Sequence, residues 1–156
     1  MEKQCFQIGD KAPDFFLMDQ NKKEFRLSDF KNKRVLLSFH PLAWTSICAQ
    51  QMQTLENNQN IFNELDTVAV GINIDSIPSK KAWAEVLKIT NTKLLSDFWP
   101  HGNVAKLYKV FRKKDGFSER ANIIVNEKQK IDFVRIYETS ELPDIREILT
   151  FLRGDE

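Results

Sequence analysis

The sequence predicts an α/β fold in which a central mixed β-sheet is flanked by helices. Two apolar runs of strand length, at residues 34–39 and 67–74, are typical of strands that are covered on both faces. Apolar residues with helical spacing lie between and after these runs, as expected when right-handed helical crossovers join parallel strands. The polar residues 126–129 separate two further apolar runs, which indicates a hairpin. The 156 residues contain no internal repeat, so we expect residues 1–156 to form a single domain.

The first part of the chain predicts an N-terminal β-hairpin extension and then a strand and a long helix. Residues 15–18 and 24–27 flank a polar turn and are expected to pair as the hairpin. Pro41 ends the strand over 34–39, because proline cannot donate a hydrogen bond to the sheet. A helix is expected over residues 45–65, since one helical face collects Cys48, Met52, Leu55, Phe62 and Leu65.

The middle of the chain predicts a second helix after the strand over 67–74. Ser76 or Ser79 can cap this helix, which is expected to end near residue 89. Its expected inner face carries Trp83, Val86 and Leu87. Lys80 and Lys81 read as part of a solvated face.

The last third of the chain predicts the remaining strands and a closing helix. A short strand is expected at 94–95, and strands over 121–125 and 130–137 form the closing hairpin. The last helix is expected to have Pro143 in its first turn and to end at Gly154. Between the strands, one helical stripe is formed by Val104, Leu107, Tyr108 and Phe111. This order of elements suits a thioredoxin-like fold.

The composition excludes several classes of function. Lys and Arg number 23 and Asp and Glu 22, so a net charge of +1 gives no field that favours nucleic acid or an anionic membrane. No apolar run approaches the length needed to cross a bilayer, and the first residues lack the apolar core of a secretory signal. We therefore expect a cytoplasmic protein in which Cys5 and Cys48 are reduced thiols.

The segment from residue 39 to residue 48 places Cys48 in the first turn of the long helix, just after a buried strand. Free backbone N–H groups and the positive end of the helix dipole meet there, and both stabilise a thiolate. Thr45 lies three residues earlier on the same face, so its hydroxyl can reach the sulfur or a substrate oxygen. Pro41 fixes the loop and removes a competing N–H. The alternative is that Cys48 is a small buried apolar residue without chemistry.

Pro41, Thr45 and Cys48 form the pattern P-x-x-x-T-x-x-C, which resembles the active-site signature of the peroxiredoxins, thiol-dependent peroxidases with a thioredoxin-like fold. Four further segments resemble motifs of that family: GDKAPDF at 9–15, LLSDFWPHG at 94–102, YKVF at 108–111 and SERANIIV at 118–125. The second and third are similar to the alkyl hydroperoxide reductase E branch, and the fourth to the strand that carries the family's active-site arginine. The resemblance covers nearly the whole chain.

The resemblance implies a reaction and a role for each matching residue. Cys48 would attack hydrogen peroxide or an organic hydroperoxide and become a sulfenic acid. Thr45 would bind the thiolate and the peroxide, and Pro41 would shield the pocket. Arg120 would hold the thiolate and polarise the O–O bond, together with the backbone amides at Ile47 and Cys48.

Two other arginines compete with Arg120 for this role. Arg112 and Arg135 also lie near the ends of expected strands, and an arginine on a strand is most often solvated. Arg120 directly precedes the apolar run over 121–125, where a side chain can turn inward. The resemblance and this position together favour Arg120.

Two positions depart from common patterns of the family. A frequent variant carries glutamate at the position of Gln51, where a carboxylate would fix the loop; Gln51 can accept a hydrogen bond but has no charge. His40 precedes Pro41 and either fills space or tunes the acidity of the site. Gln51 therefore affects the expected stability of the loop more than the chemistry.

The resemblance implies a one-cysteine cycle in which an external thiol regenerates Cys48. A thioredoxin-like or glutaredoxin-like protein, or a low-molecular-weight thiol, would attack the sulfenic acid, and a second thiol would release the mixed disulfide. Five residues after Cys48 the chain has Gln53, and no cysteine lies near its C-terminus. Three alternatives stay open: a disulfide between Cys48 and Cys5, a peroxide sensor that passes its oxidation to a partner, and a catalytically silent binding module.

The sequence also leads to expectations about binding partners and cofactors. Trp44, Phe98 and Trp99 lie in or beside expected loops, where the family often builds a homodimer contact; the alternative is ordinary core packing. The histidines and cysteines are too widely spaced for a metal site, and no glycine-rich phosphate loop is present. We expect a homodimer that uses a hydroperoxide and an external thiol, without cofactor, nucleic acid or membrane.

Overall fold

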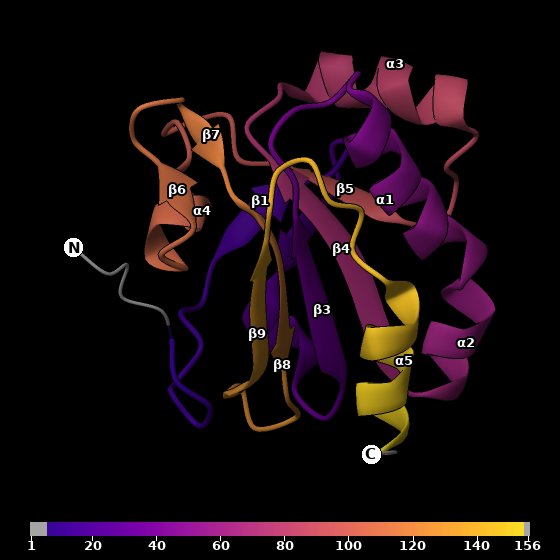
Figure 1. Cartoon of the computed structure of the whole chain (residues 1–156), viewed down its shortest axis with the longest axis vertical. Helices are drawn as coiled ribbons and strands as arrows, with labels where there is room; N and C mark the ends of the chain where they lie inside the picture. Colours follow the sequence, from indigo (N-terminus) through magenta and orange to yellow (C-terminus); the bar gives the residue numbers. More distant parts are fainter. Residues whose placement is uncertain (1–5, 155–156) are drawn as a thin grey trace.

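The computed structural model describes residues 6–154, which build a seven-stranded mixed sheet with helices packed against it (Figure 1). The strands of this sheet, in the order in which they lie side by side, are β2 (Glu24–Arg26), β1 (Phe16–Met18), β5 (Lys93–Ser96), β4 (Thr67–Asn73), β3 (Arg34–Phe39), β8 (Arg120–Val125) and β9 (Ile131–Tyr137). The helices are α1 (Ser46–Asn57), α2 (Gln59–Glu64), α3 (Ile77–Leu87), α4 (Asn103–Leu107) and α5 (Ile145–Arg153), with a 3₁₀ turn η1 at Leu27–Phe30. The predicted thioredoxin-like α/β fold with an N-terminal hairpin is confirmed.

The direction of the strands follows from their connections. Strand β3 pairs in parallel with β4, and β4 with β5, because a helix returns the chain between each pair. Strands β8 and β9 form an antiparallel hairpin that joins the other side of β3. The N-terminal hairpin β1–β2 extends the opposite edge, where β1 runs antiparallel to β5.

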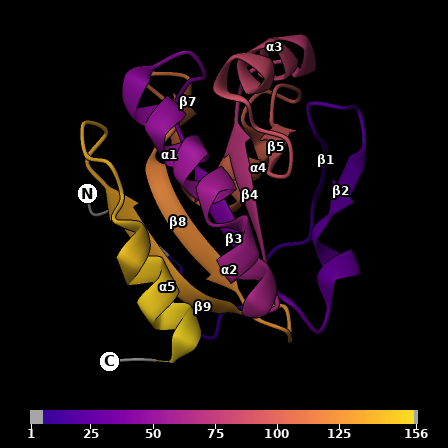
Figure 2. The same ribbon diagram turned by 90° about the vertical axis from the view of Figure 1, so that its right-hand side faces the viewer.

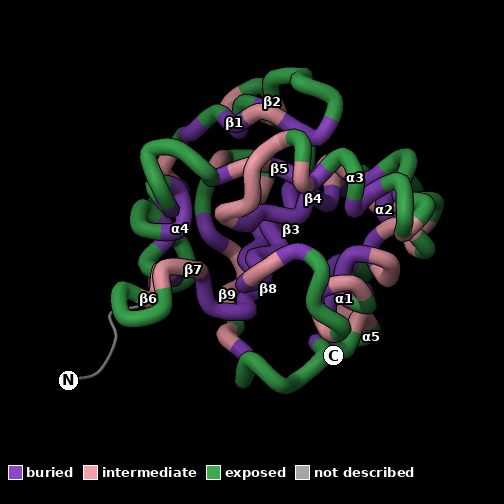
Figure 3. Tube along the Cα trace, turned by 90° about the horizontal axis from the view of Figure 1, so that it is seen from above, coloured by how far each residue is buried: buried purple, intermediate pink, exposed green. Residues whose placement is uncertain are grey.

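The sheet separates two apolar cores, because successive side chains of a strand point to opposite faces. On one face, Leu36 and Ile124 pack with α1, α2, α3 and α5, and Figure 2 shows α1, α2 and α5 across this face. On the other face, Leu37 and Ile123 pack with α4 and the N-terminal segment. The central strands β3 and β8 are accordingly coloured almost entirely as buried in Figure 3. None of the helices in residues 6–154 has the length and apolar character that crossing a membrane requires.

The helix expected over residues 45–65 is two helices that meet at Asn58. This residue has φ −109° and ψ 14°, outside the helical range, and its side-chain amide donates to the carbonyl of Thr54. Phe62 in α2 still faces the core with Met52 and Leu55 in α1. Apolar periodicity therefore continued across a break in the backbone, which is why the sequence predicted one helix.

Helix α3 begins where the sequence predicted but presents a different face to the core. The hydroxyl of Ser76 accepts a hydrogen bond from the backbone N–H of Ser79, as an N-cap does. The expectation for Val86 is wrong, since this side chain is 66% exposed. The expectation for Lys80 is also wrong: its side chain is fully buried, one turn before Trp83.

The segment after α4 differs from the predicted helical stripe. Phe111 does not continue the helix but lies in β6 (Phe111–Arg112), which pairs with β7 (Phe117–Ser118) in a separate two-stranded hairpin. Leu107 is 41% exposed, so only Val104 and Tyr108 of that stripe are buried. Strands of two residues have no hydrophobic period, and the sequence pattern could not reveal them.

Helix α5 is capped one residue later than expected. The carboxylate of Asp144 accepts a hydrogen bond of 2.9 Å from the backbone N–H of Arg146, so Pro143 precedes the N-cap and is not in the first turn. The helix ends at Gly154, whose φ of 74° is the left-handed conformation expected at this position.

The carboxylate of Glu56 ties the end of α1 to the segment before β5. It accepts hydrogen bonds from the backbone N–H groups of Thr90, Asn91 and Thr92, at 3.1, 3.1 and 2.9 Å. Burial opposes the charge of this carboxylate, but the hydrogen bonds outweigh it and lower the pKa of Glu56. The last turn of α1 is therefore anchored by a charged group that satisfies three loop amides at once.

Candidate active site

Cys48 lies at the start of α1, beneath the loop that follows β3. Its side chain is fully buried against Met52 and Ala43, and it is a free thiol. The amides of a first helical turn have no partner within the helix, so the sulfur lies where backbone donors and the helix dipole both favour negative charge. The structure therefore places Cys48 in the local environment that the sequence predicted.

Arg120, the first residue of β8, reaches the sulfur from the neighbouring strand. Its Nη1 lies 3.3 Å from Cys48 Sγ, and the side chain is 97% buried. Nε and Nη2 both donate to the carbonyl of Thr139, at 3.2 and 2.8 Å, in the segment after β9. This fork orients the guanidinium, so one nitrogen faces the sulfur while the others are held by the backbone.

Gln51 completes the hydrogen bonding of the guanidinium. Its side-chain oxygen accepts a hydrogen bond of 2.8 Å from Arg120 Nη1. Its amide nitrogen donates to the hydroxyl of Ser38 at 2.7 Å, and that hydroxyl donates to Asn122 at 2.8 Å. An uncharged side chain thus links α1 to β3 and β8 beneath the thiol. It can serve here because the amide both accepts and donates, which a carboxylate cannot do.

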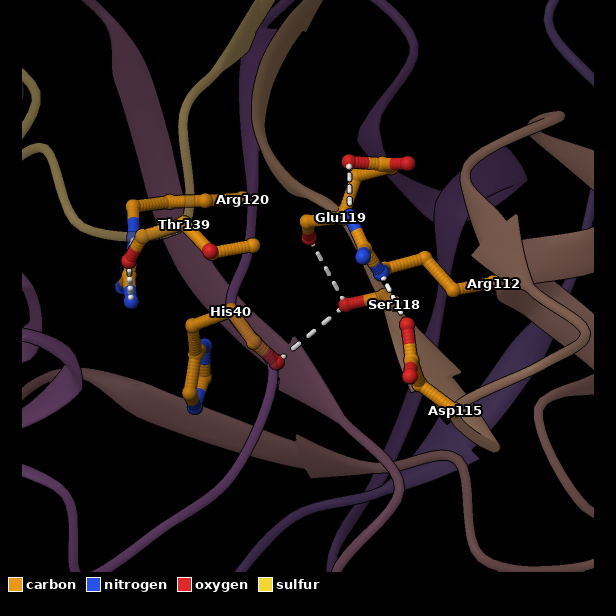
Figure 4. Close-up of polar contacts among 7 residues, drawn as sticks. All are labelled: His40, Arg112, Asp115, Ser118, Glu119, Arg120 and Thr139. Carbon is orange, nitrogen blue, oxygen red and sulfur yellow. Dashed lines mark hydrogen bonds and ion pairs between the residues drawn. The ribbon is translucent and has the colours of Figure 1, made fainter.

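Arg112 and Arg135 are engaged elsewhere. Figure 4 shows Arg112 directed toward Asp115 and Glu119, and its nitrogens lie 2.6 and 3.3 Å from the two carboxylates. Arg135 pairs with Glu147 of α5 on the outer side of β9. Of the three arginines that the sequence offered, Arg120 is the one in contact with Cys48.

Thr45 and Pro41 lie on the loop above the thiol. The hydroxyl of Thr45 donates a hydrogen bond of 2.8 Å to the carbonyl of Leu42, and Thr45 is exposed. Its proton is therefore directed to the loop and not to Cys48, while the oxygen lone pairs stay available to a ligand. Pro41 is buried. Trp44 has a left-handed backbone with φ 69°, a conformation that a bulky residue adopts only under constraint.

His40 lies at the end of β3 with its ring fully buried. Nδ1 is 3.3 Å from the carbonyl of Ser38, and the ring lies beside Trp83 with a centroid distance of 5.6 Å. Burial, and then the charge of Lys80, lower the pKa of His40 well below its usual value. The carbonyl of His40 accepts a hydrogen bond of 3.2 Å from the hydroxyl of Ser118 (Figure 4). The ring is therefore neutral near pH 7 and part of the packing around the site.

The aromatic residues that the sequence singled out do not pack in the core. Trp44, Phe98 and Trp99 are 53%, 51% and 80% exposed. Phe98 and Trp99 line an open hollow of about 750 Å³ together with Phe16 and Leu107, which are also exposed. The core-packing alternative for the three aromatics is wrong, because each leaves about half or more of its surface in solvent.

Sequence reasoning missed one buried charged residue near the site. Lys80 was read as solvated because it precedes another lysine, and no local pattern distinguishes a buried lysine from an exposed one. Ser38, which accepts a hydrogen bond from Gln51, and Asn122, which accepts one from Ser38, were hidden within apolar strand runs in the same way. Cys5 lies outside the described residues. Within residues 6–154 no cluster of three or more potential metal ligands occurs.

Comparisons of the sequence and of the structure with known proteins agree with one another. Residues 8–134 match the model of the AhpC/TSA family. The chain is 37% identical to alkyl hydroperoxide reductase E of Mycobacterium tuberculosis over 140 residues, 89% of this chain and 91% of that protein. It is 32% identical over 155 residues to a putative peroxiredoxin bcp of Haemophilus influenzae, covering 94% and 96% of the two chains. The structure of the peroxidoxin BcpB from M. tuberculosis superposes with a TM-score of 0.82 at 26% identity, over 96% of this chain and 98% of that one.

Proposed function

Since this chain belongs to the AhpC/TSA family and is a peroxiredoxin, a thiol-dependent peroxidase, we propose that Cys48 is the residue that reduces the peroxide. The observation that carries this proposal is the contact of 3.3 Å between Arg120 Nη1 and Cys48 Sγ in a fully buried environment. A buried guanidinium beside a sulfur favours the thiolate, which is the nucleophilic form of cysteine. The other buried polar groups around the sulfur orient this cation and do not neutralise it.

The reaction transfers one oxygen atom from the peroxide to the sulfur. The Cys48 thiolate attacks the outer peroxide oxygen, an S–O bond forms and the O–O bond breaks. The departing hydroxide or alkoxide takes a proton, so the products are a sulfenic acid and water or an alcohol. Negative charge moves from the sulfur to the leaving oxygen during this step. Arg120 and the amides of the first turn of α1 are the groups proposed to stabilise that charge, and the Thr45 oxygen is proposed to accept a hydrogen bond from the peroxide.

We propose a one-cysteine cycle for the return to the thiolate. One molecule of an external thiol attacks the sulfenic acid and releases water, and a second thiol displaces Cys48 from the mixed disulfide. Cys48 is the single cysteine within residues 6–154, which supports a reductant from outside the chain. A thioredoxin-like or glutaredoxin-like protein or a low-molecular-weight thiol supplies the two electrons. We propose the cytoplasm as the compartment, because the cycle requires a pool of reduced thiols.

Intact-mass measurement after one equivalent of hydrogen peroxide tests the cycle. We expect a gain of one oxygen atom at Cys48 without thiol, and a mixed disulfide or the original mass after thiol is added. A loss of two hydrogen atoms would reveal a disulfide between Cys48 and Cys5 and would contradict the one-cysteine cycle. An unchanged mass at peroxide concentrations that do not oxidise free cysteine would contradict the peroxidase assignment.

We also propose that the chain forms a homodimer through the apolar hollow that Phe98 and Trp99 line. Phe16, Phe98, Trp99 and Leu107 expose apolar surface around this hollow, and aromatic residues are enriched in the contacts between proteins. Ile77 and Pro78, at the start of α3, line the same hollow. A second copy of the chain is therefore the occupant that the surface supports, with Trp99 near the centre of the contact.

Sedimentation velocity of the Trp99→Glu variant tests the dimer. A carboxylate in a desolvated aromatic contact costs several kcal/mol of association free energy, so we expect the variant to sediment as a monomer at concentrations where the wild type is dimeric. Val86→Glu is the matched control, because Val86 is 66% exposed and does not line the hollow. A wild type that is monomeric at tens of micromolar would contradict the proposal.

A further inference from the structure

Lys80 is a charged side chain in an apolar position of α3. Residues 80, 83 and 84 form the buried stripe of this helix, and Lys80 is fully buried while its neighbour Lys81 is exposed. Its Nζ has no hydrogen-bond partner within residues 6–154. An ammonium group without a partner is costly to bury. Such a residue calls for a functional explanation more than a structural one.

Buried side chains connect the position of Lys80 with that of Cys48. One turn along α3, Trp83 lies beside the ring of His40, and Nε2 of that ring also has no hydrogen-bond partner among the described residues. The His40 ring and Met52 close over Gly71 of β4, where an added Cβ would lie 3.2 Å from His40 Cε1 and would overlap the sulfur of Met52. Met52 is one helical turn after Cys48. Cys48, Met52 and Trp83 belong to one buried apolar cluster between α1, α3 and β4, and Lys80 is fully buried one turn before Trp83.

The charged and titratable groups that influence Lys80 come from several elements. Asp75, before α3, and Asp97, after β5, are negative, and Cys48 is negative as a thiolate; all three favour the ammonium form. His40 is the titratable group at the end of β3, and it is neutral near pH 7 because burial and Lys80 itself disfavour its charged form. Arg120 lies beyond β3 on β8, so Lys80 and Arg120 approach the thiol from opposite directions along the sheet.

We propose that Lys80 is a second positioning cation of the active site, which holds the Cys48 thiolate from the α3 side while Arg120 holds it from the β8 side. The inference rests on the proposed function, because it requires Cys48 to react as a thiolate. Lys80 does not touch the peroxide; it acts through the electrostatic potential at the sulfur, in a region where water does not screen it. Figures 1 and 2 show α3 beside the start of α1, as this role requires.

The protonation of Lys80 gives the proposal a specific pH signature. Burial lowers the pKa of Lys80 to about 7, although Asp75, Asp97 and Cys48 oppose this shift. The ammonium is thus present below about pH 7 and is lost as the pH rises through this value. The same shift means that the unfolded chain holds the proton more tightly than the folded chain, so the stability of the wild type should rise between about pH 7 and pH 10.

The test compares the rate of the first oxidation of Cys48 in Lys80→Met with that in Lys81→Met. Both variants lose one lysine from α3, but only the first loses the buried one. At pH 6 we expect Lys80→Met to react about tenfold more slowly than the wild type, as for a cation near a thiolate. The difference should shrink as the pH rises above about 7, and Lys81→Met should match the wild type throughout. Equal rates for Lys80→Met and the wild type at pH 6 would overturn the proposal.

Two further measurements separate this role from a structural one. Lys80→Met should unfold at a temperature equal to or above that of the wild type near pH 7, because it removes a buried charge without a partner. Lys80→Arg keeps the charge at every pH of the experiment, so at pH 8 and above the folded variant should oxidise faster than both the wild type and Lys80→Met, which lack a charge at this position there. A folded Lys80→Arg that reacts as slowly as Lys80→Met would overturn the proposal. A wild type whose Cys48 fails to react with peroxide would instead contradict the proposed function.

Discussion

Replacing Cys48 by serine abolishes peroxide consumption, which is the largest effect we expect from any single substitution in this chain. The serine oxygen fits the space of the sulfur, but its hydroxyl stays protonated near neutral pH and is a poor nucleophile toward peroxide. Arg120, Gln51 and the helix terminus are unchanged in this variant, so only the reacting atom is removed. The measurement is the disappearance of hydrogen peroxide in the presence of excess dithiothreitol, compared with the same solution without protein.

Cys5→Ser is the matched control for this experiment. Under the one-cysteine cycle it should show a full first oxidation and normal turnover with dithiothreitol, because the external thiol does the work of a second cysteine. If Cys5→Ser is oxidised once and then stops, the two-cysteine alternative is correct and the one-cysteine cycle is wrong. If Cys48→Ser still consumes peroxide at the wild-type rate, the assignment of Cys48 fails.

Replacing Arg120 by methionine slows the first oxidation of Cys48 by about two to three orders of magnitude. This is the size of the effect when a preorganised donor to developing negative charge is removed. The guanidinium is the cation in contact with Cys48 Sγ, and the carbonyl of Thr139 holds its other nitrogens in place. Rapid mixing with peroxide, followed by intact mass or tryptophan fluorescence, gives the rate constant, and circular dichroism shows whether the variant is folded.

Arg112→Met is the control for the arginine experiment. Its guanidinium pairs with Asp115 and Glu119, away from the thiol, so we expect a rate close to that of the wild type. A small effect of Arg120→Met together with a large effect of Arg112→Met would reassign the catalytic cation. Arg135 is paired with Glu147 of α5 and provides a second comparison of the same kind.

The sequence predicted the central strands well because their signal is strong and local. Strand β3 was expected over 34–39 and observed there, and β4 ends one residue before the expected end, since continuous apolar runs mark strands covered on both faces. The break at Asn58 and the β6–β7 hairpin were missed. Helical periodicity can run across a break, and strands of two residues leave no pattern. These errors concern connections between elements and leave the layers unchanged.

Some residues of the active site could be predicted from the sequence, and others could not. Local sequence could place Cys48 at a helix start, because the strand end, Pro41 and the apolar stripe of α1 all lie within a short segment. The contact with Arg120 spans 72 positions of the chain, and it took the resemblance to a family, together with the position of Arg120 before an apolar run, to select that arginine from three. Neither the local sequence pattern nor the family resemblance could predict that Lys80 is buried. Its burial depends on how α3 turns against the sheet, which neighbouring residues in the sequence do not reveal.

The two ends of α1 are held with unequal strength, and this has a consequence for how a reductant gains access to the sulfur. Glu56 clamps the last turn, whereas Thr45 provides no side-chain cap at the first turn and gives its hydroxyl proton to Leu42. Because Cys48 has no exposed surface, an incoming thiol requires part of the helix to fray. Fraying costs least at the uncapped end, so transient unwinding should be confined to the turn that carries the sulfenic acid. The rest of the helix then stays folded, so the first turn can reform on it after each cycle.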